Sequence, residues 1–178
     1  MRRALGLDSM SFERRLDPGA LPEAGAAPEI PGPDLPVPEL PGPLTVILPV
    51  YQAHDLLADC LDRLAHHTDL SWRLIAVDDA SPDPRIRPLL ATFAASQPAG
   101  QVEVLENTEN LGFIGTVNRA LARALDGADP ARMAPVVLLN SDALVPPGWA
   151  SRLIAPILAE PDSVASCTPM SNDAELCT

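Results

Sequence analysis

The chain has 178 residues, of which 47% are hydrophobic and only 3% aromatic, so a folded domain must have a largely aliphatic core. Its formal net charge is −12 and it contains no lysine, which argues against nucleic-acid binding because no basic stripe can neutralise phosphates. The three cysteines match no zinc or disulfide framework, and no apolar run approaches the roughly 18 residues of a membrane span. We therefore expect reduced thiols in a cytoplasmic protein.

The first 43 residues are expected to form an extension ahead of the domain. Residues 2–16 are compatible with a helix that would be too short to be stable alone. Residues 18–43 contain nine prolines and four glycines, a composition that excludes a helix or a central strand. We interpret this stretch as an extended, polyproline-like and largely disordered linker; the alternative is a ligand for an aromatic-lined groove. The folded domain is expected to span residues 44–178.

From residue 44 onward, strand-like and helix-like segments alternate. Apolar or alternating runs predict strands at 44–51, 72–81, 101–107, 134–140 and 163–169. Apolar residues at helical spacing predict helices at 53–67, 83–96, 112–127 and 147–160. This order, with its short connections, predicts an α/β fold: an open, mostly parallel sheet with helices on both faces.

Polar residues gather where the predicted strands end. The ends carry, in chain order, Pro49, Val50 and Tyr51; Asp78 and Asp79; Asn107 and Asn110; and Asn140, Ser141 and Asp142. Ligands of open α/β sheets bind beyond the carboxyl ends of the strands, so these residues are candidates for one binding site. A single aspartate after a strand is also consistent with a turn, but several strand ends arranged alike favour a shared site.

The acidic character of this edge restricts the ligand. An organic anion alone would be repelled, whereas a divalent cation bridging to a diphosphate would be attracted, because Mg²⁺ and Mn²⁺ prefer hard oxygen ligands. A dinucleotide-binding G-x-G-x-x-G motif would have to follow the first strand, where the sequence reads PVYQAHD. A P-loop requires a lysine, which the chain lacks. Both of these nucleotide-binding motifs are therefore excluded.

Four segments together resemble the family 2 glycosyltransferases of GT-A fold, particularly their rhamnosyltransferase-like members. They are LTVILPVYQAHDLLADCLDRL, LIAVDDASPD, ENTENLGFIGTVNRAL and LLNSDALVPPGWASRL, in the order and spacing of the family. The ending CTPMSNDAELC also resembles the segment that follows the metal motif in that subgroup, so the resemblance extends over residues 44–176. It implies a GT-A, Rossmann-like nucleotide-binding half.

The resemblance implies a role for each candidate residue. Pro49, Val50 and Tyr51 would cradle the nucleotide. Asp79 would accept a hydrogen bond from the base, with support from Asp78. The diphosphate side would be lined by Asn110, Gly112 and Asn118. Asn140, Ser141 and Asp142 stand where the family has its D-x-D motif, so Asp142 would be the carboxylate that binds Mg²⁺ or Mn²⁺.

The function that the resemblance implies is that of an inverting, metal-dependent glycosyltransferase. The donor would be a UDP- or dTDP-sugar. The acceptor would be a polysaccharide or glycolipid precursor in the cytoplasm, with peripheral membrane association through that acceptor. Inversion needs a general base, which in the family lies in the C-terminal half, so we expect it beyond Thr178 and assign no catalytic residue within the chain. On this interpretation the chain is the donor-binding half of a larger enzyme, or a truncated product.

Two alternatives from other classes stay open at this point. A catalytically incomplete nucleotide-binding or docking module would lack the acceptor and general-base half. A nucleotidyltransferase would carry a glycine-rich loop with Lys or Arg after the first strand, and that loop is absent. Among single residues, Arg119 is interpreted as a surface residue rather than a phosphate ligand, and Trp149 as a packing residue rather than a wall of the site. Tyr51 is equally consistent with stacking on the base and with a core position.

Overall fold

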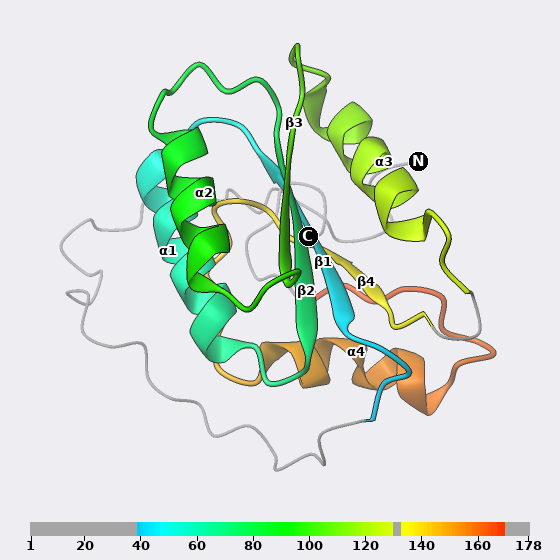
Figure 1. Cartoon of the computed structure of the whole chain (residues 1–178). Coiled ribbons are helices and arrows are strands. Elements are labelled where there is room, and N and C mark those ends of the chain that lie inside the picture. Colours follow the sequence, from blue (N-terminus) through cyan, green and yellow to red (C-terminus); the bar gives the residue numbers. More distant parts are fainter. Residues whose placement is uncertain (1–38, 130–132, 170–178) are drawn as a thin grey trace, which may run out of the picture. The chain divides into compact units, whose positions relative to one another are not determined.

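Four parallel strands alternate with four helices over residues 39–129 and 133–169, which are the residues that this computed structural model describes (Figure 1). The strands are β1 (Leu44–Val50), β2 (Trp72–Asp78), β3 (Val102–Glu106) and β4 (Val136–Leu138), in the sheet order β3-β2-β1-β4. The helices are α1 (His54–His67), α2 (Ile86–Ser96), α3 (Gly112–Leu125) and α4 (Trp149–Ala159). The predicted open, parallel α/β fold is confirmed. Most of the expected extension, residues 1–38, lies outside the described residues.

Parallel pairing brings the carboxyl ends of the strands to one edge of the sheet. Val50 of β1 pairs with Asp78 of β2, which pairs in turn with Glu106 of β3. The backbone N–H groups of Asp79 and Asn107 extend these ladders by one residue, donating to Val50 O at 2.9 Å and to Asp78 O at 2.8 Å. The residues that follow β1, β2 and β3 therefore lie side by side.

Alternation along the strands divides the core between the two faces of the sheet. On one face, fully buried side chains of β1 and β2 pack with those of α1, α2 and α4; among the largest are Leu48, Leu57, Leu61, Leu74, Leu90 and Ile154. On the other face, Ile47, Ile75 and Val77 pack against Ala120 and Ala124 of α3. Figure 1 shows α1 and α2 on one side of the strands and α3 on the other. Each buried Leu or Ile contributes roughly 1.5–3 kcal/mol, so an aliphatic core can stabilise this aromatic-poor chain.

The expected fifth strand at 163–169 is wrong. The chain makes a turn at 161–163 and continues without regular structure to residue 169. Val164 is the only branched apolar residue of this stretch and most of its neighbours are exposed, so the segment has little to bury against a sheet. The Cys167 thiol donates to Leu153 O, which places the segment beside α4 instead.

At two of the element bounds that differ from the prediction, a residue with left-handed backbone interrupts the strand or the helix. β2 ends at Asp78, short of the predicted residue 81, and Ala80 has a φ of 53°. α4 begins at Trp149, two residues later than predicted, directly after Gly148 with a φ of 66°. In the described ranges, no helix combines the length and the apolar character that crossing a bilayer would require.

Candidate functional site

A cavity of about 340 Å³ opens beyond the carboxyl edge of the sheet. Its walls come from the ends of β1 and β2, the start of α3 and the loop after β4. The lining residues are Pro49, Val50, Tyr51, Ala53, Leu56, Asp79, Asn110, Gly112, Phe113, Thr116, Asn140, Ser141 and Asp142. The structure thus brings together candidate residues from four separate segments of the sequence.

Three residues expected at the site do not line the cavity, and one of them, Asn107, is buried and hydrogen-bonded to Asp79. Asp78 is fully buried behind it, where its carboxylate accepts hydrogen bonds from Ser81 N at 2.8 Å and from Arg87 Nε at 3.2 Å. Asp78 therefore holds the loop after β2, and any support that it gives to Asp79 is indirect. Asn118 is exposed on α3, two residues beyond Thr116, and helical periodicity turns it away from the cavity wall that Thr116 lines.

The Asp79 carboxylate lines the cavity but is almost entirely buried, with 4% of the residue exposed. Its Oδ1 atom accepts hydrogen bonds from Asn107 Nδ2 at 2.6 Å and from the Leu111 N–H at 2.8 Å. Burial raises the pKa of this carboxyl, yet hydrogen bonds outweigh that effect and lower the pKa below its usual range. The largest lowering effects come from the Asn107 amide and the Leu111 N–H, and the nearby Thr116 hydroxyl and Gly112 N–H add smaller ones. Asp79 is therefore ionised at neutral pH and ties the start of α3 to the end of β2.

The start of α3 depends on a glycine. Gly112 has a φ of 69°, in the left-handed region that glycine adopts without the penalty of a Cβ atom. Its N–H donates to Asn110 Oδ1 at 2.8 Å, which holds the Asn110 side chain against the helix start. Both residues line the cavity.

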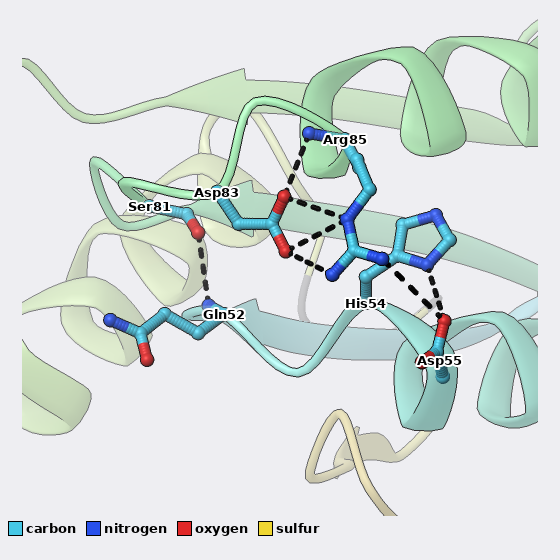
Figure 2. Close-up of polar contacts among 6 residues, drawn as sticks. All are labelled: Gln52, His54, Asp55, Ser81, Asp83 and Arg85. Atoms are coloured by element: carbon cyan, nitrogen blue, oxygen red, sulfur yellow. Dashed lines mark hydrogen bonds and ion pairs between the residues drawn. The ribbon is translucent and has the colours of Figure 1, made fainter.

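The turn after β1 carries Tyr51 and Ala53 into the cavity wall in a strained conformation. Gln52 and Ala53 have φ values of 61° and 54°. Left-handed backbone costs roughly 1–2 kcal/mol for each residue with a side chain. The Gln52 N–H donates to Ser81 Oγ at 3.0 Å, which ties this turn to the loop after β2 (Figure 2). Strained backbone of this kind clusters at ligand sites, where the surroundings hold it in place.

Charged side chains join the same two segments outside the cavity wall (Figure 2). Arg85 Nη2 donates to Asp83 Oδ2 at 2.7 Å, and Arg85 Nη1 lies 3.9 Å from Asp55 Oδ1. The same Asp55 oxygen lies 2.8 Å from His54 Nδ1. Hydrogen bonds from Arg85 lower the pKa of Asp83 to about 2. The first turn of α1 is thereby linked to the segment that precedes α2.

The loop after β4 is anchored from α1. Cys60 Sγ donates to Asn140 O at 3.6 Å, and His67 Nδ1 lies 2.7 Å from Val145 O. Burial, and then the negative charge of Asp142, raise the pKa of Cys60 to about 11, so its thiol stays protonated at neutral pH. The backbone of this loop is therefore held at both ends by one helix.

The Asp142 side chain itself is exposed, and no other described residue forms a hydrogen bond or ion pair with it. Within residues 39–129 and 133–169, no cluster of three or more His, Cys, Asp and Glu side chains is arranged to hold a metal ion. Mg²⁺ and Mn²⁺ are commonly bound by one or two carboxylates together with substrate phosphates. An unpaired carboxylate in a polar loop, next to the oxygens of Asn140 and Ser141, fits that mode of binding.

Four lining residues were not predicted: Ala53, Leu56, Phe113 and Thr116. Thr116 follows Gly112 by one helical turn, so the periodicity of α3 is a signal that would have placed it on the same side. Phe113 and Leu56 are 55% and 47% exposed, which is unusual for large apolar side chains that line a cavity. Local sequence holds no signal for Leu56, because its place depends on how α1 lies against the sheet.

The two interpretations of Tyr51 and Trp149 are now separated. Tyr51 is 46% exposed at the cavity, so its core alternative is wrong. Trp149 is 7% exposed, belongs to the core, and donates through Nε1 to Thr68 Oγ1 at 3.1 Å. Trp149 therefore packs beneath the loop after β4 instead of lining the cavity.

Comparison with known proteins places the chain in a family. The family model for glycosyl transferase family 2 matches residues 45–176, which is most of the chain. The chain belongs to glycosyl transferase family 2. The family expected from the four sequence segments is therefore confirmed, and the α/β sheet is the GT-A-like fold of that family.

Individual relatives are much longer than this family 2 chain. An uncharacterised protein, y4gI, from Sinorhizobium fredii is 31% identical over 124 residues, which are 68% of this chain and 13% of the relative. The mannosyltransferase PcManGT from Pyrobaculum calidifontis, in complex with GDP-Man and Mn²⁺, is 26% identical with a TM-score of 0.50, covering 68% of this chain and 34% of its own. TarS 1–349 from S. aureus is 20% identical with a TM-score of 0.47, covering 68% and 32%. The matched part of the chain thus spans about a third of each of these two solved structures.

Proposed function

We propose that this chain is the donor-binding part of an inverting glycosyltransferase that takes its sugar from a nucleotide-diphosphate sugar. The observation that carries the proposal is that Asp79 and Asp142 line the same cavity. Asp79 directly follows β2 and Asp142 lies in the loop after β4, and these two strands flank β1 in the sheet. Membership of family 2 and the likeness to PcManGT, whose structure contains GDP-Man and Mn²⁺, support it.

The Asp79 side of the cavity would bind the nucleobase. Uracil and thymine each present an N–H group, and an ionised carboxylate is an acceptor for it. Tyr51 and Phe113 expose aromatic surface at the same cavity, so a planar base can pack against them. UDP- and dTDP-sugars are accordingly the proposed donors, with a rhamnosyltransferase-like member of the family as the proposed subgroup.

The Asp142 side would bind the diphosphate through a cation. Asp142 would hold Mg²⁺ or Mn²⁺, with Asn140 and Ser141 beside it. A cation bound there would neutralise the negative charge that develops on the diphosphate when the sugar–phosphate bond breaks. Without it, the carboxylates of Asp142 and Asp79 would repel the donor. We further propose a polysaccharide or glycolipid acceptor, met in the cytoplasm or at the membrane surface.

A binding experiment tests the proposal. UDP- and dTDP-sugars are titrated into the purified chain by calorimetry, with and without Mn²⁺. We expect binding that requires Mn²⁺ and that weakens at least tenfold in Asp142→Ala, a loss of about 1.4 kcal/mol or more. Asp59→Ala is the matched control, because it removes an equal charge from an exposed position of α1 outside the cavity. Equal binding by wild type and Asp142→Ala would contradict the metal site.

The alternative function, a nucleotide-binding or docking module without catalysis, predicts the same binding and differs in turnover. Release of nucleoside diphosphate from a donor sugar, measured with an added saccharide acceptor, separates the two. Turnover that Asp142→Ala abolishes supports the transferase. Because the general base is expected beyond Thr178, tight Mn²⁺-dependent binding without any release supports the module only if it persists when the chain is expressed with any sequence that continues its reading frame.

A further inference from the structure

A chain of polar side chains connects the surface of α3 to the Asp79 carboxylate in the cavity. Arg119 Nη1 donates to Asn107 Oδ1, and also to Glu106 O at 2.7 Å. Asn107 is 3% exposed and donates through Nδ2 to Asp79 Oδ1 at 2.6 Å and to Thr116 Oγ1 at 3.0 Å. In the described part of the chain, no buried side-chain nitrogen or oxygen lacks a hydrogen-bond partner. Each buried polar atom of the cluster therefore has at least one partner before any ligand binds.

The two charged ends fix the direction of the Asn107 amide. A guanidinium can only donate and a carboxylate can only accept, so the amide oxygen must face Arg119 and the NH₂ group must face Asp79. The reversed amide would put donor against donor at one end and acceptor against acceptor at the other. In the observed direction, the guanidinium polarises the amide, which strengthens the hydrogen bond to the carboxylate.

We propose that Asn107 is a positioning residue for Asp79: with Arg119 behind it, Asn107 keeps the Asp79 carboxylate charged and fixes the direction from which that carboxylate accepts a base N–H. This inference rests on the proposed function, in which Asp79 contacts the base. A carboxylate offers about four acceptor positions. The hydrogen bonds from Asn107 Nδ2 and from the Leu111 N–H both go to Oδ1, and no described residue forms a hydrogen bond with Oδ2, so this second oxygen keeps acceptor capacity for a base.

The other charged groups around the cluster leave Arg119 as its cationic end. Asp78 and Glu106 are both paired with Arg87 of α2, each at 3.2 Å. Asp142 comes from the loop after β4, on the other side of β1, and shares the cavity with Asp79. Removing the guanidinium of Arg119 should therefore act on Asp79 mainly through Asn107.

The first test removes that guanidinium. Arg119 is exposed, so Arg119→Met should fold, and it keeps most of the aliphatic stem. Arg123→Met is the matched control, because Arg123 also joins α3 to β3, through Glu103 at 2.7 Å, but is not bonded to Asn107. The titration midpoint of the Asp79 carboxyl carbon is followed by NMR in the full chain. We expect it to rise by about half a pH unit or more in Arg119→Met and to stay unchanged in Arg123→Met.

The second test changes Asn107 itself. Asn107→Asp puts two carboxyl groups in contact, and such a pair binds one proton with a strongly raised pKa. Below that pKa, the shared proton replaces the amide N–H; above it, two negative charges repel and Asp79 is displaced. Affinity for uridine should therefore fall several-fold between about pH 5.5 and pH 8 in Asn107→Asp, and stay level in the wild type. Thr108→Asp, with the same added charge at the exposed next residue, should also stay level.

Uridine and 3-methyluridine separate failure of this inference from failure of the proposed function. The methyl group removes the N–H that Asp79 would accept, and neither nucleoside carries a phosphate that needs a cation. We expect the wild type to prefer uridine about tenfold, and Arg119→Met but not Arg123→Met to lose part of that preference. If the wild type binds both nucleosides equally, the proposed contact between Asp79 and the base is wrong. The titration midpoints of Asp79 in the wild type and in Arg119→Met still test whether Asn107 positions Asp79. An Asp79 midpoint that stays at its wild-type value in Arg119→Met overturns the inference, whether or not Asn107→Asp folds.

Discussion

The two aspartates that share the cavity are in opposite physical situations. Asp79 is 4% exposed, and its carboxylate accepts hydrogen bonds from Asn107 and from the backbone of Leu111. Asp142 is exposed, and within the described ranges no residue forms a hydrogen bond or ion pair with it. The fold thus fixes the Asp79 carboxylate before a ligand arrives, whereas the Asp142 carboxylate depends on a ligand for its partners.

This difference matches what each side is proposed to bind. A hydrogen bond from a base is directional, so its acceptor gains from a fixed orientation. A cation with oxygen ligands from a phosphate can adjust to one carboxylate, so that carboxylate needs little support. The strand ladders explain why the two sides differ, because Asp79 N still pairs with Val50 O, whereas Asp142 lies beyond the end of the short strand β4.

The most severe test of this comparison is the stability of two alanine variants. Asp79→Ala removes the acceptor of the Leu111 N–H and one of the two acceptors of the buried Asn107 NH₂ group, so we expect it to lower the free energy of unfolding by about 3 kcal/mol. Asp142→Ala removes no hydrogen bond or ion pair with a described residue, and we expect a change within about 0.5 kcal/mol. Urea denaturation of both variants beside the wild type measures the difference. Similar losses in the two variants would contradict the comparison.

Parts of this site were predictable from sequence because they depend on local pattern. The apolar runs of β1 and β2 specify buried parallel strands, and parallel strands must bring Tyr51, Asp79 and Asp142 to one edge. The prediction of a fifth strand was wrong because a segment with an apolar residue such as Val164 forms a strand only if it can pair with the edge of a sheet.

Other features depend on contacts between distant segments. Asp79 caps the start of α3 from 32 residues away, at Leu111, and nothing in either segment alone indicates this. Leu56 enters the cavity wall only because of how α1 lies on the sheet. The hydrogen bonds of Asn107 to Arg119 and Asp79 likewise could not be predicted, although Asp79 and Asn107 stand at strand ends in the sequence, because Arg119 lies within α3 and gave no sign of this contact.

A smaller change in stability tests whether the fold also fixes the turn after β1, which carries Tyr51 into the cavity wall, as it fixes Asp79. Gln52 has a φ of 61°, so Gln52→Gly should relieve left-handed strain and raise the free energy of unfolding by up to about 1 kcal/mol. Gln97→Gly is the matched control, because Gln97 has a φ of −97° and the same substitution there should destabilise by about 0.5 kcal/mol. Thermal and urea denaturation of the two variants compare them. Destabilisation by both would mean that the turn after β1 is not strained.

The smallest expected effect is a pH dependence of the free energy of unfolding that comes from Asp83, outside the cavity wall. The pKa of Asp83 is lowered to about 2 by hydrogen bonds from Arg85, whereas an aspartate in an unfolded chain has a pKa of about 3.9. A lowered pKa in the folded state means that Asp83 stabilises the fold above about pH 4 and that this contribution is lost as the pH falls toward 2. Asp83→Asn should therefore be less stable than the wild type at pH 5 and equally stable near pH 2.

Urea denaturation across that range measures the convergence of the two proteins, with Asp59→Asn on the exposed face of α1 as the control for loss of one charge. A constant gap between wild type and Asp83→Asn at every pH would show that the Asp83–Arg85 pair acts through packing rather than through its charge. Convergence near pH 2 would show that the charge of Asp83 stabilises the fold through its contact with Arg85, which Figure 2 draws. This stabilisation would not depend on a ligand at Asp142.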